Sequence, residues 1–172
     1  MANTPQYDVD SYDVITPKIM ELLNQYPALA SDDAITFSTL DENRGKAMFP
    51  LSGGVIENKQ TDIWGHVTEI CVYPFFVVYR AGNLTAQRRS AVKEWLDDLG
   101  RWLERQTIYI NVNNVATPYK LNAYPTLQGD RRFISIQRTA PAALNNINDN
   151  NTEDWAISIT ARYRNEYEVN NG

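Results

Sequence analysis

Residues 67–80, VTEICVYPFFVVYR, form the densest apolar stretch of the chain. Successive side chains of a strand point to opposite faces of a sheet, and apolar residues here occupy both parities, so both faces need cover. One parity holds Ile70, Val72, Phe76 and Val78, and the other holds Cys71, Tyr73, Phe75, Val77 and Tyr79. Pro74 lacks a backbone donor, which predicts a bulge, an edge position or a break near the middle.

Two other segments have the three- and four-residue apolar spacing of amphipathic helices. The stronger one runs from about Thr85 to Arg105. Gly100 inside it costs about 1 kcal/mol relative to Ala, which predicts either a close packing contact or a bend. The shorter one spans Pro17 to Tyr26, with Thr16 as the N-cap and Pro17 at the first helical position. Two helices can cover one face of the long apolar strand, so the second face needs cover from elsewhere.

Period-two alternation predicts further strands at 35–39, 108–112, 132–138 and 155–164, with Asn113-Asn114 as a turn after the second. We therefore predict a single α+β domain over residues 17–168, with a mostly antiparallel mixed sheet and both helices on one of its faces. Residues 1–16 and 169–172 are expected to be flexible ends.

Residues 41–62 differ in composition from the rest of the chain. Gly45, Pro50, Gly53 and Gly54 interrupt any long element, although 47–49 and 55–56 could add short pieces of strand. We predict a long protruding hairpin loop here.

Composition narrows the classes of function that the chain can have. Its 172 residues suit one domain, and 16 basic against 21 acidic residues give a formal charge of −5, which argues against general binding of a phosphate backbone. Cys71 is the single cysteine and His66 the single histidine, which excludes an internal disulfide and a histidine-based metal site. No apolar run approaches the roughly 20 residues that cross a bilayer, and residues 1–13 are polar and acidic, so we expect a soluble chain without a signal peptide.

The negative charge is concentrated in the first third of the chain. Residues 1–62 contain ten acidic and four basic residues, whereas residues 63–172 contain eleven acidic and twelve basic residues. This asymmetry fits solubility alone, or an acidic surface that complements a basic partner or lines a channel through which DNA slides without sticking.

Motifs that could carry catalysis are sparse. Residues 52–54, SGG, lack the Lys and Ser/Thr of a phosphate-binding loop and are interpreted as a turn. His66 could act as a general base with Asp62 or Glu69, but no Ser or Cys stands nearby at a strand-to-helix turn that would expose a nucleophile. Cys71 lies in the most apolar strand, where a thiol fills the core and its pKa rises.

Two oxygen-rich segments could hold a cation. Asp8, Asp10 and Asp13 resemble the start of a calcium loop, but the Gly and the terminal Glu of an EF-hand are missing, and a solvated, mobile N-terminus is expected instead. Residues 148–154 fit either a cation site or a turn built on Asn and Asp side chains. We predict no catalytic, cofactor-binding or metal-binding residues.

The order of these segments is similar to that of one family of viral proteins. A helix, a strand, a long hairpin, the apolar strand ending in Tyr79-Arg80 and an amphipathic helix are followed by RRFISIQRT at 131–139, an Asn/Asp-rich loop and DWAISITARYR at 154–164. From Pro17 to Tyr167 this pattern resembles the tail terminator proteins of long-tailed bacteriophages, which are sometimes described as minor capsid or neck proteins. In that family, small subunits form a six-membered ring that caps the tail tube, stops its polymerisation and joins it to the head-side connector.

The resemblance implies a structural virion protein of the phage neck and tail, assembled in the host cytoplasm, and not an enzyme. The implied partners are further copies of the chain in a ring of six, the tail tube protein, and the connector or stopper protein. DNA would pass through the ring without specific binding, and neither a cofactor nor a membrane is implied.

The protruding segment and the doubly apolar strand both indicate surfaces that other chains complete. Deleting residues 44–59 is expected to abolish assembly and to leave the fold intact. The candidate residues for contact with a neighbouring subunit or the tube are Arg44, Lys46, Met48, Phe49, Leu51 and Ile56. The candidate acidic residues facing the lumen of the ring are Asp41, Glu42, Glu57 and Asp62.

Three alternatives stay open at this stage. A head-completion or stopper protein on the connector side belongs to the same structural class, although the strong helix and the late strand favour a terminator over the small β-barrels typical of stoppers. A small hydrolase that uses His66 with nearby carboxylates is a remote alternative. A monomeric adaptor would have the mass of one 19.6 kDa chain in solution.

Overall fold

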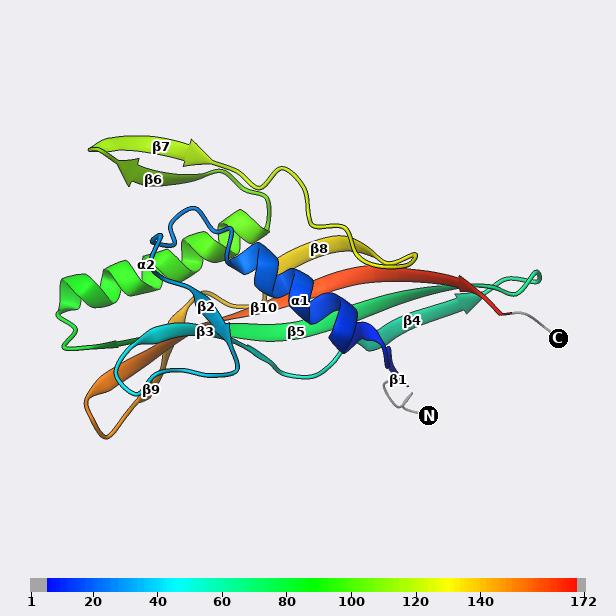
Figure 1. The fold of residues 1–172 in the computed structure, drawn as a ribbon, viewed down its shortest axis with the longest axis horizontal. Coiled ribbons are helices and arrows are strands. Elements are labelled where there is room, and N and C mark those ends of the chain that lie inside the picture. The colour runs from blue at the N-terminus through cyan, green and yellow to red at the C-terminus, as the bar shows by residue number, and fades with distance from the viewer. Residues whose placement is uncertain (1–5, 170–172) are drawn as a thin grey trace.

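Two strands of 17 residues each, β5 (His66–Gly82) and β10 (Thr152–Glu168), run the length of the molecule side by side (Figure 1). The computed structural model describes residues 6–169. The two strands pair antiparallel without interruption, from Thr152 opposite Gly82 to Glu168 opposite His66. At about 3.3 Å per residue each spans roughly 55 Å, and the molecule is correspondingly elongated.

An eight-stranded sheet is built around this pair, in the order β1-β4-β5-β10-β8. β3 also pairs with β5, β9 also pairs with β10, and β2 lies parallel to β3; every other pairing among the described strands is antiparallel. The remaining strands are β1 (Gln6–Tyr7), β2 (Ile35–Phe37), β3 (Gly45–Pro50), β4 (Val55–Thr61), β6 (Ile108–Val112), β7 (Val115–Tyr119), β8 (Arg132–Arg138) and β9 (Ala143–Ile147).

Two helices, α1 (Ser11–Leu23) and α2 (Ala86–Leu103), pack on one face of this sheet. The odd-numbered side chains of β5 point into the core that the helices close, and Cys71 and Tyr73 there have no exposed surface. Thr16 of α1 bonds Tyr73 across 2.6 Å between the two hydroxyl oxygens, and Leu96 of α2 belongs to the same core. The predicted α+β fold, with a mostly antiparallel sheet and helices on one face, is confirmed.

The helix α2 begins and packs as its sequence predicts. Thr85 is its N-cap, and the threonine hydroxyl accepts a hydrogen bond from the Arg88 backbone amide. A Cβ atom at Gly100 would lie 2.2 Å from Cδ of Arg138 and 2.9 Å from Cδ1 of Ile157. Of the two explanations offered for Gly100, close packing against the sheet is therefore confirmed.

The first helix was placed wrongly by the sequence pattern, because α1 begins at Ser11 and contains Pro17 in its interior. Ser11, Ile15 and Ile19 are buried at four-residue spacing, so the stripe that packs on the sheet starts well before Pro17. Pro17 lies on the exposed side, and the carbonyl that its missing N–H leaves unpaired can bond water.

The prediction of a flexible segment over residues 1–16 is likewise wrong for residues 6–16, which form β1 and the start of α1. Residues 1–5 and 170–172 lie outside the described part of the chain.

Residues 41–62 do not form a protruding loop over most of their length. β3 and β4 both pair with β5, and Ala47 and Met48 are completely buried. The short connection between them, which includes residues 52–54, continues the chain in the same direction along the same edge of β5. The glycines and the proline in this segment mark the interruption between two strands that follow one another along β5, and not an excursion into solvent.

Pro74 lies where β5 exchanges one neighbour for another. β3 pairs with β5 as far as Phe75, and β4 pairs with β5 from Val72 onward, so no ladder bond is needed from Pro74 on this side. The Pro74 carbonyl accepts from the Leu51 backbone amide at 2.9 Å. Of the three predicted alternatives, β5 shows neither a bulge nor a break at Pro74, and the proline lies where neither β3 nor β4 extends its ladder, which resembles the predicted edge position.

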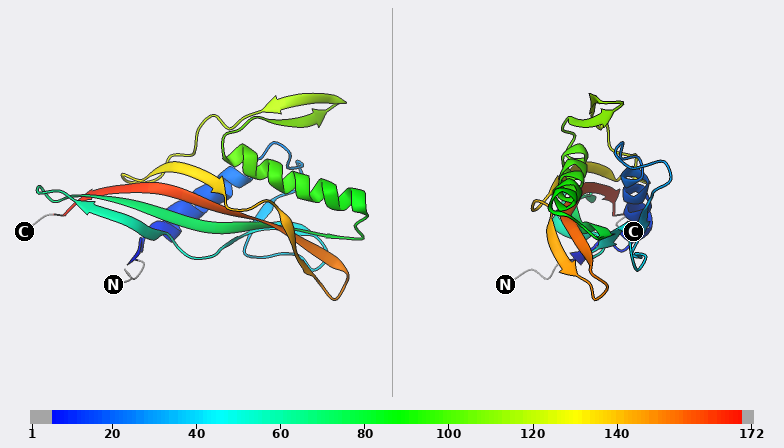
Figure 2. Two further views of the ribbon diagram at one scale, coloured as in Figure 1. Left: turned by 180° about the vertical axis from the view of Figure 1, so that it is seen from behind. Right: turned by 90° about the vertical axis from the view of Figure 1, so that its left-hand side faces the viewer.

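The strands β6 and β7 form a separate two-stranded hairpin that stands beyond α2, away from the main sheet (Figures 1 and 2). Asn113 and Asn114 have φ angles of 51° and 63°, which is the left-handed conformation that a tight two-residue hairpin turn requires. The predicted strand at 108–112 and its turn are confirmed, whereas the returning strand β7 and the later strand β9 were not predicted.

Candidate functional site

The face of the sheet opposite the helices carries an apolar strip on β3, β4 and β5. Phe49 stacks on Phe76 with 5.4 Å between ring centroids, and Val55 lies opposite Val72. These side chains keep part of their surface exposed, unlike the buried odd-numbered residues of β5. We define the open strip as Phe49, Leu51, Val55, Ile70, Val72 and Phe76.

The membership of Leu51 in the open strip follows from its backbone. The Leu51 amide bonds the Pro74 carbonyl, which continues the register of β3 along β5 and places Leu51 beside an even-numbered residue. Its side chain is 62% exposed. On β10, the same face of the sheet turns polar, and Arg162 there pairs with Glu57. The open strip is thus apolar on one half of the face and bordered by charge on the other.

Of the six residues predicted to contact a neighbour, the structure places only Phe49 and Leu51 on the open strip. Met48 is fully buried and Ile56 packs against the core, because both point toward the helices. These two residues are removed from the candidate interface.

The two basic residues of that predicted set, Lys46 and Arg44, differ in exposure. Lys46 is 9% exposed, forms an ion pair with Asp33, and its ammonium lies 4.2 Å from the centre of the Tyr79 ring. Arg44 is exposed at the mouth of a hollow near the end of β5. Lys46 is therefore part of the fold, and the six residues do not form one surface.

The four predicted lumen residues are spread over the molecule. Asp41 lies near Arg80, whose guanidinium donates to the Asp41 carbonyl at 3.1 Å, and Glu42 follows it at this end of β5. Asp62 lies at the opposite end, before His66, and the stretch of β5 from Arg80 to His66 spans roughly 46 Å. Glu57 lies between them and bonds Arg162. A single chain therefore does not gather these carboxylates on one surface.

The turn between β4 and β5 exposes two large apolar side chains that the sequence analysis did not single out. Ile63 is 90% exposed and Trp64 is 84% exposed. The turn beneath them is fixed, because the Asp62 carboxylate accepts from the backbone amides of Trp64 and His66 at 2.8 and 2.9 Å. The sequence does contain a signal for this exposed pair: Asp-Ile-Trp-Gly at 62–65 has the residues of a tight turn, with its two apolar residues at the central positions.

The β6–β7 hairpin exposes a second apolar surface. Ile108 at its root is 2% exposed and belongs to the core, whereas Val112 and Val115 at its end are 40% and 63% exposed. These three side chains lie on one face of the hairpin, since Val112 pairs with Val115 and Ile108 pairs with Tyr119. We call residues 108–119 the arm.

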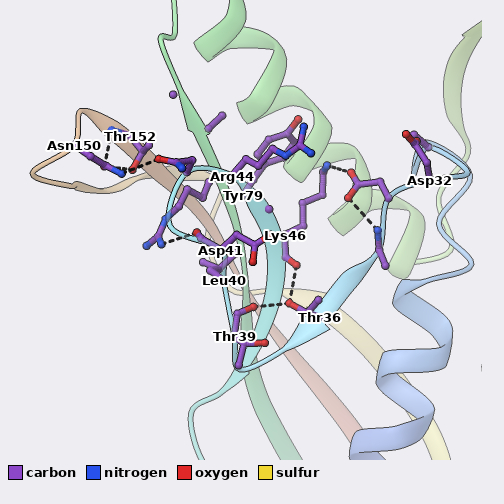
Figure 3. Close-up of a pocket in the computed structure, with 18 of the residues that line it drawn as sticks. Asp32, Thr36, Thr39, Leu40, Asp41, Arg44, Lys46, Tyr79, Asn150 and Thr152 are labelled. Carbon is purple, nitrogen blue, oxygen red and sulfur yellow. Dashed lines mark hydrogen bonds and ion pairs between the residues drawn. The ribbon is translucent and has the colours of Figure 1, made fainter.

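A hollow with a volume of about 890 Å³ lies between the β2–β3 connection and the β9–β10 turn (Figure 3). Three of the six charged residues that line it form ion pairs, Lys46 with Asp33 and Arg80 with Asp154, and the other three are Asp32, Asp41 and Arg44. Its walls are mainly polar. Among the described residues that line it there is no His, Cys or Ser side chain.

The β9–β10 turn, where a cation site or an Asn-rich turn was expected, is held by its own side chains. The side-chain amide of Asn148 donates to the Thr152 hydroxyl at 2.9 Å and to the Asp154 carboxylate at 3.2 Å, and the Thr152 hydroxyl donates to the side-chain oxygen of Asn150 at 2.7 Å. Asn150 also donates to the Glu42 backbone carbonyl, which fastens the turn to the β2–β3 connection. The geometry favours the turn.

The groups proposed for catalysis are not brought together. The Asp62 carboxylate bonds the backbone amide of His66, and Glu69 points to the opposite face of β5, where it is 3% exposed and accepts from Tyr167 at 2.7 Å. Cys71 has no exposed surface, and burial raises the pKa of its thiol to about 12, as predicted for a core cysteine. Within residues 6–169, no three His, Cys, Asp or Glu side chains are grouped so that they could hold a metal ion.

Asp8, the first residue of the calcium-like segment, is committed to the fold. Its carboxylate accepts from Arg131 at 3.0 and 3.1 Å and from the Tyr163 hydroxyl at 3.0 Å, and it is 9% exposed. Burial raises the pKa of the Tyr163 phenol far above its ordinary value, so this hydroxyl remains a donor. The expected solvated N-terminus is therefore wrong at Asp8.

The chain was compared with known protein families and with curated proteins. A scan against protein-family models and a search of curated proteins both find no match to this chain. In the described part of the chain, no helix is long and apolar enough to cross a bilayer.

Proposed function

We propose that this chain is a structural subunit that assembles with copies of itself into a ring in the neck of a bacteriophage tail, as a tail terminator. The observation that carries the proposal is that one folded chain leaves three apolar surfaces uncovered: the open strip, the end of the arm, and the Ile63-Trp64 turn. Uncovered apolar surfaces at separate places on one domain are typical of a protein with several neighbours.

The charge of the chain is compatible with this role. The formal charge of −5 and the exposed Asp41 and Glu42 provide little attraction for a phosphate backbone, so DNA could pass such a ring without binding to it. The tail tube protein and a connector or stopper protein would be the neighbours on the two sides of the ring, and the virion would be its location.

The second candidate of the same class is a head-completion or stopper protein. The Ile63-Trp64 turn favours attachment to some larger assembly, and this feature serves a stopper as well as a terminator. Contact with the tail tube distinguishes the two, because a terminator caps the tube and a stopper binds the connector.

The test is to measure the mass of the purified chain with and without tubes polymerised from the tail tube protein of the same genome, and to image the tubes by electron microscopy. A terminator is expected to form rings on tube ends and to limit tube length. Tubes of unchanged length with bare ends would contradict the proposal, and binding to the connector alone would favour a stopper. A chain that remains at 19.6 kDa with both partners would favour a monomeric adaptor.

A further inference from the structure

The arm has no charged side chain anywhere between Thr107 and Tyr119. A protruding surface hairpin is normally kept soluble by charged residues, and a charge-free one is suited to burial. The lower part of its apolar face is covered, since Ile108 is 2% exposed and Ile110 and Tyr119 pack against the core, whereas Val112 and Val115 at the end are 40% and 63% exposed. The outer half of the arm therefore has an apolar face prepared for a contact that its own chain does not make.

The arm is also fixed in shape before any such contact forms. Five residue pairs join β6 to β7, and the Asn113-Asn114 turn adopts the left-handed conformation of a tight hairpin. A two-stranded hairpin in water is marginally stable without packing on one face, so covering Val112 and Val115 would stabilise the arm itself. A preformed arm loses little conformational entropy on binding.

The same chain carries a surface of matching character that the arm cannot reach. The helix α2 lies between the arm and the sheet, whereas the open strip is on the face of the sheet that points away from the helices (Figures 1 and 2). Each chain thus has one uncovered apolar projection and one uncovered apolar strip, on opposite sides of the molecule. Because the arm of one chain cannot reach the strip of the same chain, a second copy can cover it, and a head-to-tail arrangement of copies covers both surfaces on every chain inside the assembly.

We infer that the arm of one copy packs on the open strip of the next copy, with Val112 and Val115 against Leu51, Phe49 and Phe76. This inference rests on the proposed ring and names the contact that closes it. A head-to-tail contact of this kind uses two different surfaces on each chain, and it closes into a ring when the rotation between copies allows. The charged pair of Glu57 and Arg162 borders the strip and limits where a charge-free arm can lie.

The test is disulfide cross-linking between two variants of the full chain, Val115→Cys and Leu51→Cys. Both positions are exposed, and Cys71 has no exposed surface and gives no background. On mild oxidation, an equimolar mixture should give a cross-linked dimer, and each variant alone should give much less. The matched control is Ile147→Cys mixed with Leu51→Cys, because Ile147 is 61% exposed on β9 and outside both surfaces.

A second test needs no cysteine and replaces the two apolar side chains at the end of the arm with polar ones. The double variant Val112→Ser/Val115→Ser should raise the apparent dissociation constant of self-assembly by about tenfold or more, with Ile147→Ser as the control that leaves it unchanged. Circular dichroism and thermal melting of each variant establish that the body remains folded.

The outcomes separate this contact from the ring itself. If the variants assemble to the native mass but the mixture gives no cross-linked dimer, the copies meet elsewhere. The same holds if Val115→Cys cross-links only with itself. Either result would overturn the inference and would leave the proposed ring untouched. A chain that stays at 19.6 kDa at its solubility limit and on tail tubes would overturn both.

Discussion

Asp8 and Asp154 are buried carboxylates that the fold neutralises in the same way, with the paired nitrogens of one arginine. Arg131 donates to Asp8 at 3.0 and 3.1 Å, and Arg80 donates to Asp154 at 2.7 and 2.8 Å. Such bidentate pairs are the strongest of the ordinary ion pairs, and loss of one partner leaves the other charge buried and unpaired. At the residue scale, these pairs connect segments that are far apart in the sequence.

The first prediction concerns the pair that fastens the N-terminus. Arg131→Ala should lower the free energy of unfolding by about 3 kcal/mol, because it leaves the Asp8 carboxylate buried with only the Tyr163 hydroxyl as a partner. Urea denaturation measures this change. The control Arg164→Ala breaks an exposed pair with Glu166 and should cost less than about 1 kcal/mol. Equal costs for the two variants would contradict the prediction.

The second prediction is a pH dependence. The hydrogen bonds from Arg80 hold the pKa of Asp154 below its ordinary value of 3.8, so the ionised form stabilises the fold. This stabilisation is fully present above the ordinary pKa and is lost as the pH falls through the lower, folded-state pKa. Asp154→Asn should therefore be less stable than the native chain at pH 7, by about 2 kcal/mol, since it leaves Arg80 without its carboxylate.

The difference between the two chains should shrink below about pH 4, because the native chain then loses the same ion pair. Thermal melting across this range measures the difference. A gap of constant size down to pH 2 would show that the carboxylate charge is not the cause.

At the scale of single elements, α2 depends on one position where it touches the sheet. Gly100 lets the helix backbone approach Arg138 and Ile157, and Arg138 cannot simply move away because Glu104 holds its guanidinium at 2.9 Å. A glycine that ordinarily weakens a helix is here the residue that permits close packing.

The third prediction follows from this contact. Gly100→Ala should destabilise the fold by about 1–3 kcal/mol, although alanine is the better helix former, because the new methyl group overlaps Arg138 and Ile157. Ser90→Ala, on the exposed side of the same helix, is the control and should be neutral or slightly stabilising. Chemical denaturation of both variants gives the comparison, and a stabilised Gly100→Ala would show that the helix can shift at no cost.

At the scale of the whole molecule, β3 and β4 are part of the main sheet, because both pair with β5. The arm, in contrast, is a separate hairpin outside the main sheet. β3 and β4 bring Met48 and Ile56 into the core and pair along most of β5. The arm contacts the body mainly at its root, where Ile108 is buried. Removal of the two segments should therefore have opposite effects on the fold.

The fourth prediction revises the expected result of deleting residues 44–59. This deletion removes β3 and most of β4, so we expect loss of the fold, with no cooperative unfolding transition, and not an assembly defect in a folded chain. As the contrast, replacing residues 110–117 by Asn-Gly keeps the Tyr109–Pro118 pair and should leave the body folded, with a melting temperature lower by only a few degrees. Circular dichroism during heating separates the two, and an intact transition in the first deletion would contradict this account.

The sequence alone determined the elements whose periodicity is long and uninterrupted. The amphipathic pattern of α2, the alternation along β10 and the two apolar faces of β5 all survive in the structure, because local spacing decides which side chains share a face. The Asn113-Asn114 turn was also predictable, since its left-handed geometry is a local property.

Only the tertiary structure decided where the short and broken segments belong. Pro17 appeared to start a helix that actually begins at Ser11, and the glycines of residues 45–54 suggested a loop where two strands add to β5. In each case the deciding energy comes from burial against residues far away in the chain, such as Tyr73 against Thr16, which no local pattern contains. The candidate surfaces follow the same rule: the sequence shows that β5 is apolar on both faces, and the fold decides which face the helices cover and which face stays partly exposed.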